Sequence, residues 1–197
     1  IARNLIGDSA DFAILDGSGG TKGEVRAYAT SSGLTAKGAL SVTANGNQRI
    51  NALVGAGAVA IAYGGKEKAL SIGGSGVVTE NKIAMTIEAE VDGGSAKKNI
   101  TAASVRVAAE DKSSIQALAG AASAAVAISP KNNALALAIG VSAASNMIDN
   151  EITASLVNLG SLKTTGDVVV TAFDNSDIDS SSVAIAVSVA VGGENSV

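Results

Sequence analysis

The sequence predicts an all-β repeat array with about 65 residues in each repeat unit. Two observations predict it: the chain resembles itself when shifted by one unit, and equivalent runs alternate with a period of two. A third is the scarcity of aromatic residues, with two Phe, two Tyr and no Trp. Aromatic side chains supply much of the buried area of a thick core. We therefore expect a thin core of Ala, Val and Ile, built by units that stack on their neighbours.

The internal repeat covers most of the chain. Residues 39–91 align with residues 104–156 without a gap, and this places Ile50 opposite Ile115. Such agreement exceeds what shared composition alone would produce. The sequence therefore divides into a tail of a preceding repeat plus a Gly-rich insertion (1–38), one repeat (39–103), a second repeat (104–166) and a partial repeat (167–197).

Both ends of the sequence fit the same pattern. The partial repeat places Val168 opposite Val105, and the opening Asn4 falls on Asn81. After the opening residues, the connection that carries Gly17 to Gly33 is longer than its later counterparts, so we interpret this stretch as a Gly-rich insertion. Because the first residues already belong to a repeat, we expect the sequence to be a section of a longer chain.

The long Ala-rich runs are predicted to be strands, although Ala is the best helix former. In the first full unit, the equivalent run contains Gly55 and Gly57, each of which would cost about 1 kcal/mol inside a helix. In the last unit, Val183 to Val191 alternates strictly and is rich in β-branched residues. If the units share a fold, all three runs are strands.

Each full unit is expected to hold a short strand, a long strand, a polar turn and two further strands. Gly55, Gly57 and Gly120 are expected to bend the long strands, because Gly inside a strand often marks a bulge or corner. The predicted strands are Leu40–Ala44, Ile50–Tyr63, Ala69–Val78 and Ile83–Val91 in the first full unit, and Val105–Ala109, Ile115–Ile128, Ala134–Ala143 and Ile148–Leu156 in the second.

The second and third strands have an unusual alternation. One face carries large aliphatic side chains, and the other carries small apolar ones instead of charges. We expect the small face either to be covered closely by a neighbouring layer or to be an exposed flat surface for assembly. On the second reading, the chain self-associates into filaments or layers through flat Ala, Ser and Gly faces, with an assembly face made of Ala58, Ala60, Ala62, Ala134, Ala136 and Ala138.

Three segments carry a resemblance to a known family: Asn146 with Ile148, the run Thr165 to Ala172 and the alternating Val183 to Val191. This rhythm resembles the repeats of leukotoxin-type filamentous adhesins, which are giant bacterial surface proteins. The resemblance implies a β-solenoid-like rod that is exported to the bacterial cell surface or beyond it. It also implies a structural or adhesive role in a filament, with a host cell or a neighbouring cell as a candidate partner.

Charge and composition exclude several function classes. The formal charge is -4, without the basic patch that nucleic-acid binding requires. The absence of Cys and His removes thiolate chemistry and the usual general base. The Ala-rich runs are too short for spanning helices, which need about 20 residues, and four aromatic residues cannot supply the girdles of a membrane barrel. We therefore predict no nucleic-acid partner, no membrane span and no enzymatic activity.

The densest carboxylates are Asp174, Asp177 and Asp179. Oxygen ligands at this spacing are candidate ligands for calcium, the one cofactor that the sequence suggests. The pattern lacks the Gly-rich loop of a dedicated site, so a solvated loop is the favoured explanation. Two alternative functions stay open. One is a calcium-dependent ligand-binding module that uses these residues. The other is a carbohydrate-active β-helix enzyme, which would need clustered acids on one sheet face.

Overall fold

The computed structural model describes residues 1–7 and 21–193 and contains only strands, turns and irregular segments in that part. Within these described residues, fifteen strands form five three-stranded sheets, and all of the strand pairings are parallel. The predicted all-β class is confirmed.

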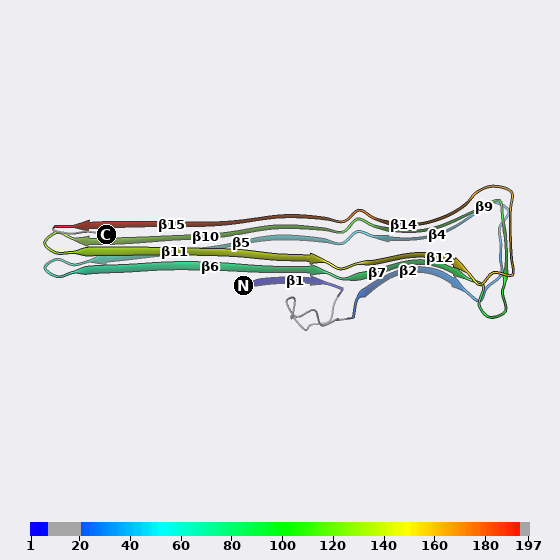
Figure 1. The fold of residues 1–197 in the computed structure, drawn as a ribbon, viewed down its shortest axis with the longest axis horizontal. Coiled ribbons are helices and arrows are strands. Elements are labelled where there is room, and N and C mark those ends of the chain that lie inside the picture. Colours follow the sequence, from blue (N-terminus) through cyan, green and yellow to red (C-terminus); the bar gives the residue numbers. More distant parts are fainter. Residues whose placement is uncertain (8–20, 194–197) are drawn as a thin grey trace.

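One passage of the chain shows how the sheets arise. It runs outward along β4 (Ala39–Gly46) and β5 (Arg49–Tyr63), reverses in a turn, and returns along β6 (Ala69–Ile83) and β7 (Met85–Asp92). It then crosses back through the short β8 (Asn99–Ala102). We call this passage a coil and its reversal between β5 and β6 the tip. Figure 1 shows the resulting flat, elongated outline, with the tip at its left end.

The remaining strands follow the same path above and below this coil. Each strand lies beside its counterpart, so the sheets have the orders β5-β10-β15, β4-β9-β14, β1-β6-β11, β2-β7-β12 and β3-β8-β13. The strands before β4 are β1 (Ala2–Ile6), β2 (Gly23–Thr30) and β3 (Leu34–Thr35), and those after β8 are β9 (Ser104–Asp111), β10 (Ser114–Ser129), β11 (Ala134–Ile148), β12 (Glu151–Val157), β13 (Ser161–Thr164), β14 (Val168–Asp174) and β15 (Asp177–Gly192).

The strand register pairs the residues that the sequence alignment places opposite each other. Ile115 lies between Ile50 and Ile178, and Asn81 lies between Asn4 and Asn146. Identical or similar side chains therefore stack in rows that run across the coils. Because the register has no slip, every strand keeps the same set of side chains on its inner side.

Several strand boundaries differ from those predicted. β6 continues to Ile83, beyond the predicted end at Val78, because its parallel pairing with β1 and β11 continues to that residue. β5 and β10 run without interruption through Gly55, Gly57 and Gly120, so the expected bends do not break the strands. A Cβ at any of these three glycines would meet nothing within 4 Å, which places them on an open face instead of at a corner.

The predicted Gly-rich insertion is partly ordinary sheet. Gly23–Thr30 forms β2 and pairs with β7, and Leu34–Thr35 forms β3 and pairs with β8. The interpretation of this part as an insertion is therefore wrong, because alternation in β2 matches that of β7. The remainder of the expected insertion, residues 8–20, lies outside the described residues.

The half of each coil that is remote from the tip has a thick core. There the crossing strand β8 adds a third wall, and Ile87, Ile100, Val105 and Val107 have no exposed surface. These side chains belong to one buried cluster that extends to Ile115. Large β-branched residues fill this space, which fixes the distance between the outgoing and returning strands.

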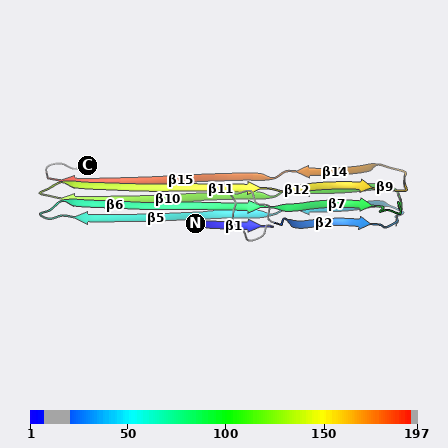
Figure 2. The ribbon, with the colours of Figure 1, turned by 60° about the horizontal axis from the view of Figure 1, so that its bottom comes forward.

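Toward the tip, the core becomes thin. Its buried side chains are mainly Ala, as in the cluster that contains Ala125, Ala127 and Ala134. A Cβ added to Gly73 would lie 2.6 Å from the carbonyl oxygen of Ala124 in the opposite layer. The two layers therefore approach backbone to backbone, closer than the roughly 10 Å usual for packed sheets. Figure 2 shows the strands of the two layers alternating across the view as they run to the tip.

Candidate interaction surface

The six alanines predicted as an assembly face lie between the two layers. Ala134 and Ala136 are buried, and Ala58, Ala60, Ala62 and Ala138 are partly buried. Of the two alternatives for the small-residue face, the close neighbouring layer is the one observed. The expected exposed assembly face is absent at these positions, because small side chains let the layers close over one another.

The outward positions of the same strands carry large aliphatic side chains. Leu53, Val59 and Ile61 on β5 are 79%, 74% and 73% exposed. Equivalent outward residues follow on β10 and β15, because the register keeps each row in line. We call this surface the outer aliphatic face, made of Leu53, Val59, Ile61, Tyr63, Leu118, Val126, Ile128, Val183, Ile185, Val187, Val189 and Val191.

The opposite side of the tip half is apolar as well. There β6 and β11 expose Leu70, Ile72, Leu135, Leu137, Ile139 and Val141. The segments 50–65, 69–79, 114–130, 132–148 and 180–193 contain no charged residue. Contiguous exposed apolar surface of this kind marks an interaction site in most proteins.

The outer aliphatic face is not flat. Gly55, Gly57 and Gly120 leave open space above β5 and β10. Gly57 and Ala122 also line a shallow apolar hollow, bounded by Val59 and by side chains of β15. On the tip side of this hollow, the rows of Val59, Ile61 and Tyr63 stand above the sheet. The face therefore has a hollow and a ridge along the same strands.

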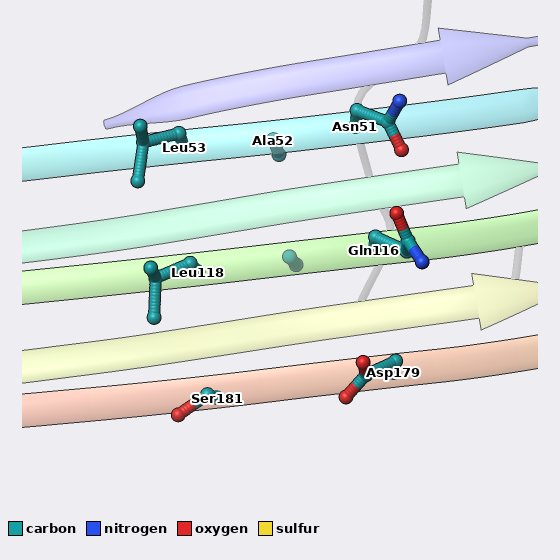
Figure 3. A pocket seen from close by; sticks show the side chains of 8 residues that line it. Asn51, Ala52, Leu53, Gln116, Leu118, Asp179 and Ser181 are labelled. Carbon is teal, nitrogen blue, oxygen red and sulfur yellow. The ribbon is translucent and has the colours of Figure 1, made fainter.

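The end of this face farthest from the tip is polar. Gln116 lies between Asn51 and Asp179 in the register, and Figure 3 shows these three side chains in one column across the strands. The adjacent column consists of Leu53, Leu118 and Ser181. Both columns line a pocket. The aliphatic surface therefore begins at the row of Leu53 and Leu118.

The three candidate calcium ligands are not brought together. Asp174 accepts a hydrogen bond of 2.9 Å from the backbone N–H of Ser176 in the turn before β15. Asp177 and Asp179 lie two residues apart on β15, which separates their Cα atoms by about 7 Å in an extended strand. Among residues 1–7 and 21–193, no three His, Cys, Asp or Glu side chains are placed to hold a metal ion. Calcium binding by these three residues therefore stays a prediction.

A buried asparagine ladder was missed by sequence reasoning. Asn4 Nδ2 donates to Asn81 Oδ1, and Asn81 Nδ2 donates to Asn146 Oδ1, each at 2.7 Å. Asn146 Nδ2 in turn donates to Ser180 Oγ at 2.8 Å. Asn81 is fully buried, so the ladder satisfies a polar group that would otherwise destabilise the core. The recurrence of Asn at the same position of the aligned units was the sequence signal that could have predicted this ladder.

Asp111 is a second buried polar centre, at the junction of the thick and thin halves. It has no exposed surface and accepts hydrogen bonds from Ser113 Oγ and Asn150 Nδ2, both at 2.6 Å. Its neighbour in the preceding coil is Gly46, where a Cβ would lie 2.7 Å from Asp111 Oδ1. Glycine therefore makes room for this carboxylate, whose hydrogen bonds join the outgoing and returning parts of one coil.

Two surface groups have shifted pKa values. Arg26 donates from Nε to Glu88 Oε2 at 2.6 Å, and this hydrogen bond raises the pKa of the guanidinium. The backbone N–H of Gly94 and then the amide of Asn158 lower the pKa of Asp92 by hydrogen bonding to its carboxylate. Both Glu88 and Asn158 lie in the coil next to their partners. These contacts link neighbouring coils.

No protein family, curated protein or solved structure matches the chain. The part of the chain that the structure describes has no helix long and apolar enough to cross a membrane. The outer aliphatic face is therefore identified by its geometry, exposure and lack of charge.

Proposed function

We propose that the chain is a section of a β-solenoid with a repeat of about 65 residues, and that it serves as a structural or adhesive module of a long bacterial filament, secreted or held at the cell surface. The observation that carries this proposal is the in-register stacking of equivalent residues, as in the row Ile50, Ile115 and Ile178. Each coil presents to the next the same surface that it receives from the previous one. Such a stack can be extended without a change of contacts.

The mechanism is mechanical. Parallel hydrogen-bond ladders join each strand to its counterpart, and the asparagine ladder adds side-chain bonds along the same direction. The buried rows of Val, Ile and Ala resist sliding, because a slip of one residue would turn every inner side chain outward. A rod made in this way is stiff along the direction in which the coils stack.

The resemblance to leukotoxin-type filamentous adhesins supports this proposal. It rests on the residues 146–148, 165–172 and 183–191. The first and third of these lie within β11 and β15, and the second contains the segment that leads into β14 and most of β14 itself. Repeated strands of this kind suit a protein whose role is to extend from a surface. Neither alternative function, calcium-dependent ligand binding or polysaccharide cleavage, is favoured by a specific observation.

The proposal is tested by lengthening the chain. Ten further copies of residues 104–166, inserted after Gly166, should lengthen the particle along the stacking direction by about 48 Å, at roughly 4.8 Å for each coil. The cross-section should not change. Negative-stain images and small-angle X-ray scattering would measure both dimensions against the 197-residue chain. A particle that grows equally in all directions would contradict the proposed rod.

A further inference from the structure

We infer that the outer aliphatic face binds the same face of a second copy of this chain, with the ridge of each copy seated in the hollow of the other. The inference deepens the proposed structural role and rests on it, because the partners would be two rods. It assigns lateral association to the large aliphatic residues and not to the alanines.

The relief of the face is self-complementary. The hollow at Gly55, Gly57 and Gly120 and the ridge of Val59 and Ile61 lie on the same strands, one after the other along the chain. A two-fold axis that lies in the plane of contact, perpendicular to the strands, would place two copies antiparallel and set each ridge over the opposite hollow. This is the isologous contact that is most common among homodimers.

The area of the face is of the right order for this contact. Three strands about 4.8 Å apart and eleven residues long, at about 3.3 Å for each residue, cover roughly 500 Å². A standard interface buries about 800 Å² on each partner. The three stacked strands β5, β10 and β15 should therefore pair weakly, and additional coils should strengthen the pairing because each adds another row of contacts.

A lipid bilayer is the less suitable occupant. Between the row of Asn51, Gln116 and Asp179 and the tip, the face has no Lys or Arg side chain that would attract anionic lipid headgroups, and the formal charge of the chain is -4. A second copy of the same face needs no such charges.

Charge agrees with a protein partner of the same kind. The face has no charged side chain between the row of Asn51, Gln116 and Asp179 and the tip, so two copies meet without burying an ion. In an antiparallel pair, the polar row of each copy lies beyond the tip-side ridge of the other, at the rim of the contact. A polar rim around an apolar centre is typical of protein interfaces.

The first test fills the hollow without adding charge. In a Gly55→Val, Gly57→Val variant, the Cβ atom added at each position meets nothing within 4 Å in the single chain, so the fold should be retained. Sedimentation equilibrium of the 197-residue chain over a concentration series should show a weak dimer. The variant should dimerise about tenfold more weakly. Gly38→Val, which adds a side chain to another open position, is the matched control and should dimerise as the wild type does.

This variant separates shape-specific pairing from general stickiness. Both substitutions add apolar surface, so non-specific association would become stronger. Circular dichroism and the melting temperature would show that the fold is unchanged. Tighter association of the filled variant, or a wild-type chain that stays monomeric up to about 0.5 mM, would overturn the inference.

The second test places charges on the ridge. Ile61, Val126 and Val189 form one outward row, so Ile61→Lys, Val126→Glu and Val189→Lys put opposite charges side by side and avoid repulsion within the sheet. Dimerisation should be lost. The control places the same charges on an outward row of β4, β9 and β14, with Ser41→Lys, Arg106→Glu and Val169→Lys, and should dimerise normally.

A flotation assay distinguishes the lipid alternative. Wild-type protein would be mixed with vesicles of phosphatidylcholine and phosphatidylglycerol and centrifuged through a density gradient. We expect the protein to stay with the dense fractions. If the wild-type protein floats with the vesicles and the variant with charges on the ridge does not, pairing is overturned as the role of this face. The inference and the proposed rod fail separately: a chain that lengthens with added coils but never dimerises contradicts only the pairing, and a dimer that does not lengthen contradicts only the rod.

Discussion

Asn81 illustrates how a stacked core accommodates a polar side chain. Its amide accepts a hydrogen bond from Asn4 and donates one to Asn146, so the Asn side chains of successive coils form hydrogen bonds with one another. An isolated buried amide would lose its hydrogen bonds with water and destabilise the fold. In a parallel, in-register stack, the amide of the next coil replaces that water. The ladder therefore also favours the correct register.

Replacing Asn81 with Ala should destabilise the chain strongly. The substitution removes two hydrogen bonds and leaves the amide groups of both neighbours without their partner, so the free energy of unfolding should fall by about 2–4 kcal/mol. Urea unfolding followed by circular dichroism would measure this. Asn4→Ala is the control, because Asn4 makes one ladder bond at the more exposed end and should cost less. An equal loss in both variants would contradict the ladder's role.

At the scale of the element, the inner and outer faces of β6 leave different amounts of space for side chains. Gly73 points into the thin core, where a Cβ would lie 2.6 Å from the backbone of Ala124. Gly74 points outward, where the nearest atom to a Cβ would be the carbonyl oxygen of Ile139, at 3.9 Å. The inner glycine is required by the close approach of two backbones. The outer glycine is not.

Gly73→Ala and Gly74→Ala should therefore have opposite effects. The inner substitution forces the layers apart, and overpacking of this kind costs about 1–3 kcal/mol of unfolding free energy. The outer substitution should leave stability unchanged or raise it by about 0.5–1 kcal/mol, because Ala restricts the unfolded chain more than Gly does. Thermal and urea unfolding of the two variants would decide. Similar destabilisation by the two substitutions would contradict the close backbone approach at Gly73.

At the scale of the whole molecule, the stack has a centre and two ends. β10 is flanked by β5 and β15, and β6 is flanked by β1 and β11. The outer strands have a partner on one side only within their sheets. Local opening should therefore begin at the ends of the stack, since fewer contacts must break there.

Hydrogen exchange should reveal this order. Backbone amides of β10 should exchange more slowly than those of β5 and β15, although the three strands have similar composition. Mass spectrometry of peptides from each strand, at a concentration too low for pairing, would measure the rates. Equal protection in all three strands would contradict an unpaired edge at the ends of the stack.

The tip half and the thick half of the molecule have different tasks in our proposals. The thick half has its large side chains inside and its charges outside, as in the ion pair of Arg26 with Glu88. The tip half has small side chains inside and large aliphatic ones outside. The first arrangement suits a stable support, and the second suits a surface that meets another rod.

The sequence alone determined which residues share a row and that the long runs are strands. Alternation places Ala134 and Leu135 on opposite faces of β11, and the alignment places Asn81 beside Asn146, because side-chain direction has a period of two and equivalent residues stack. Only the tertiary structure decided which face is inside. Both faces of the tip half are apolar, so the pattern of hydrophobic residues could not choose between them. In the folded chain the two layers of the tip half approach backbone to backbone at Gly73, so only small side chains fit between them and the large aliphatic residues face outward.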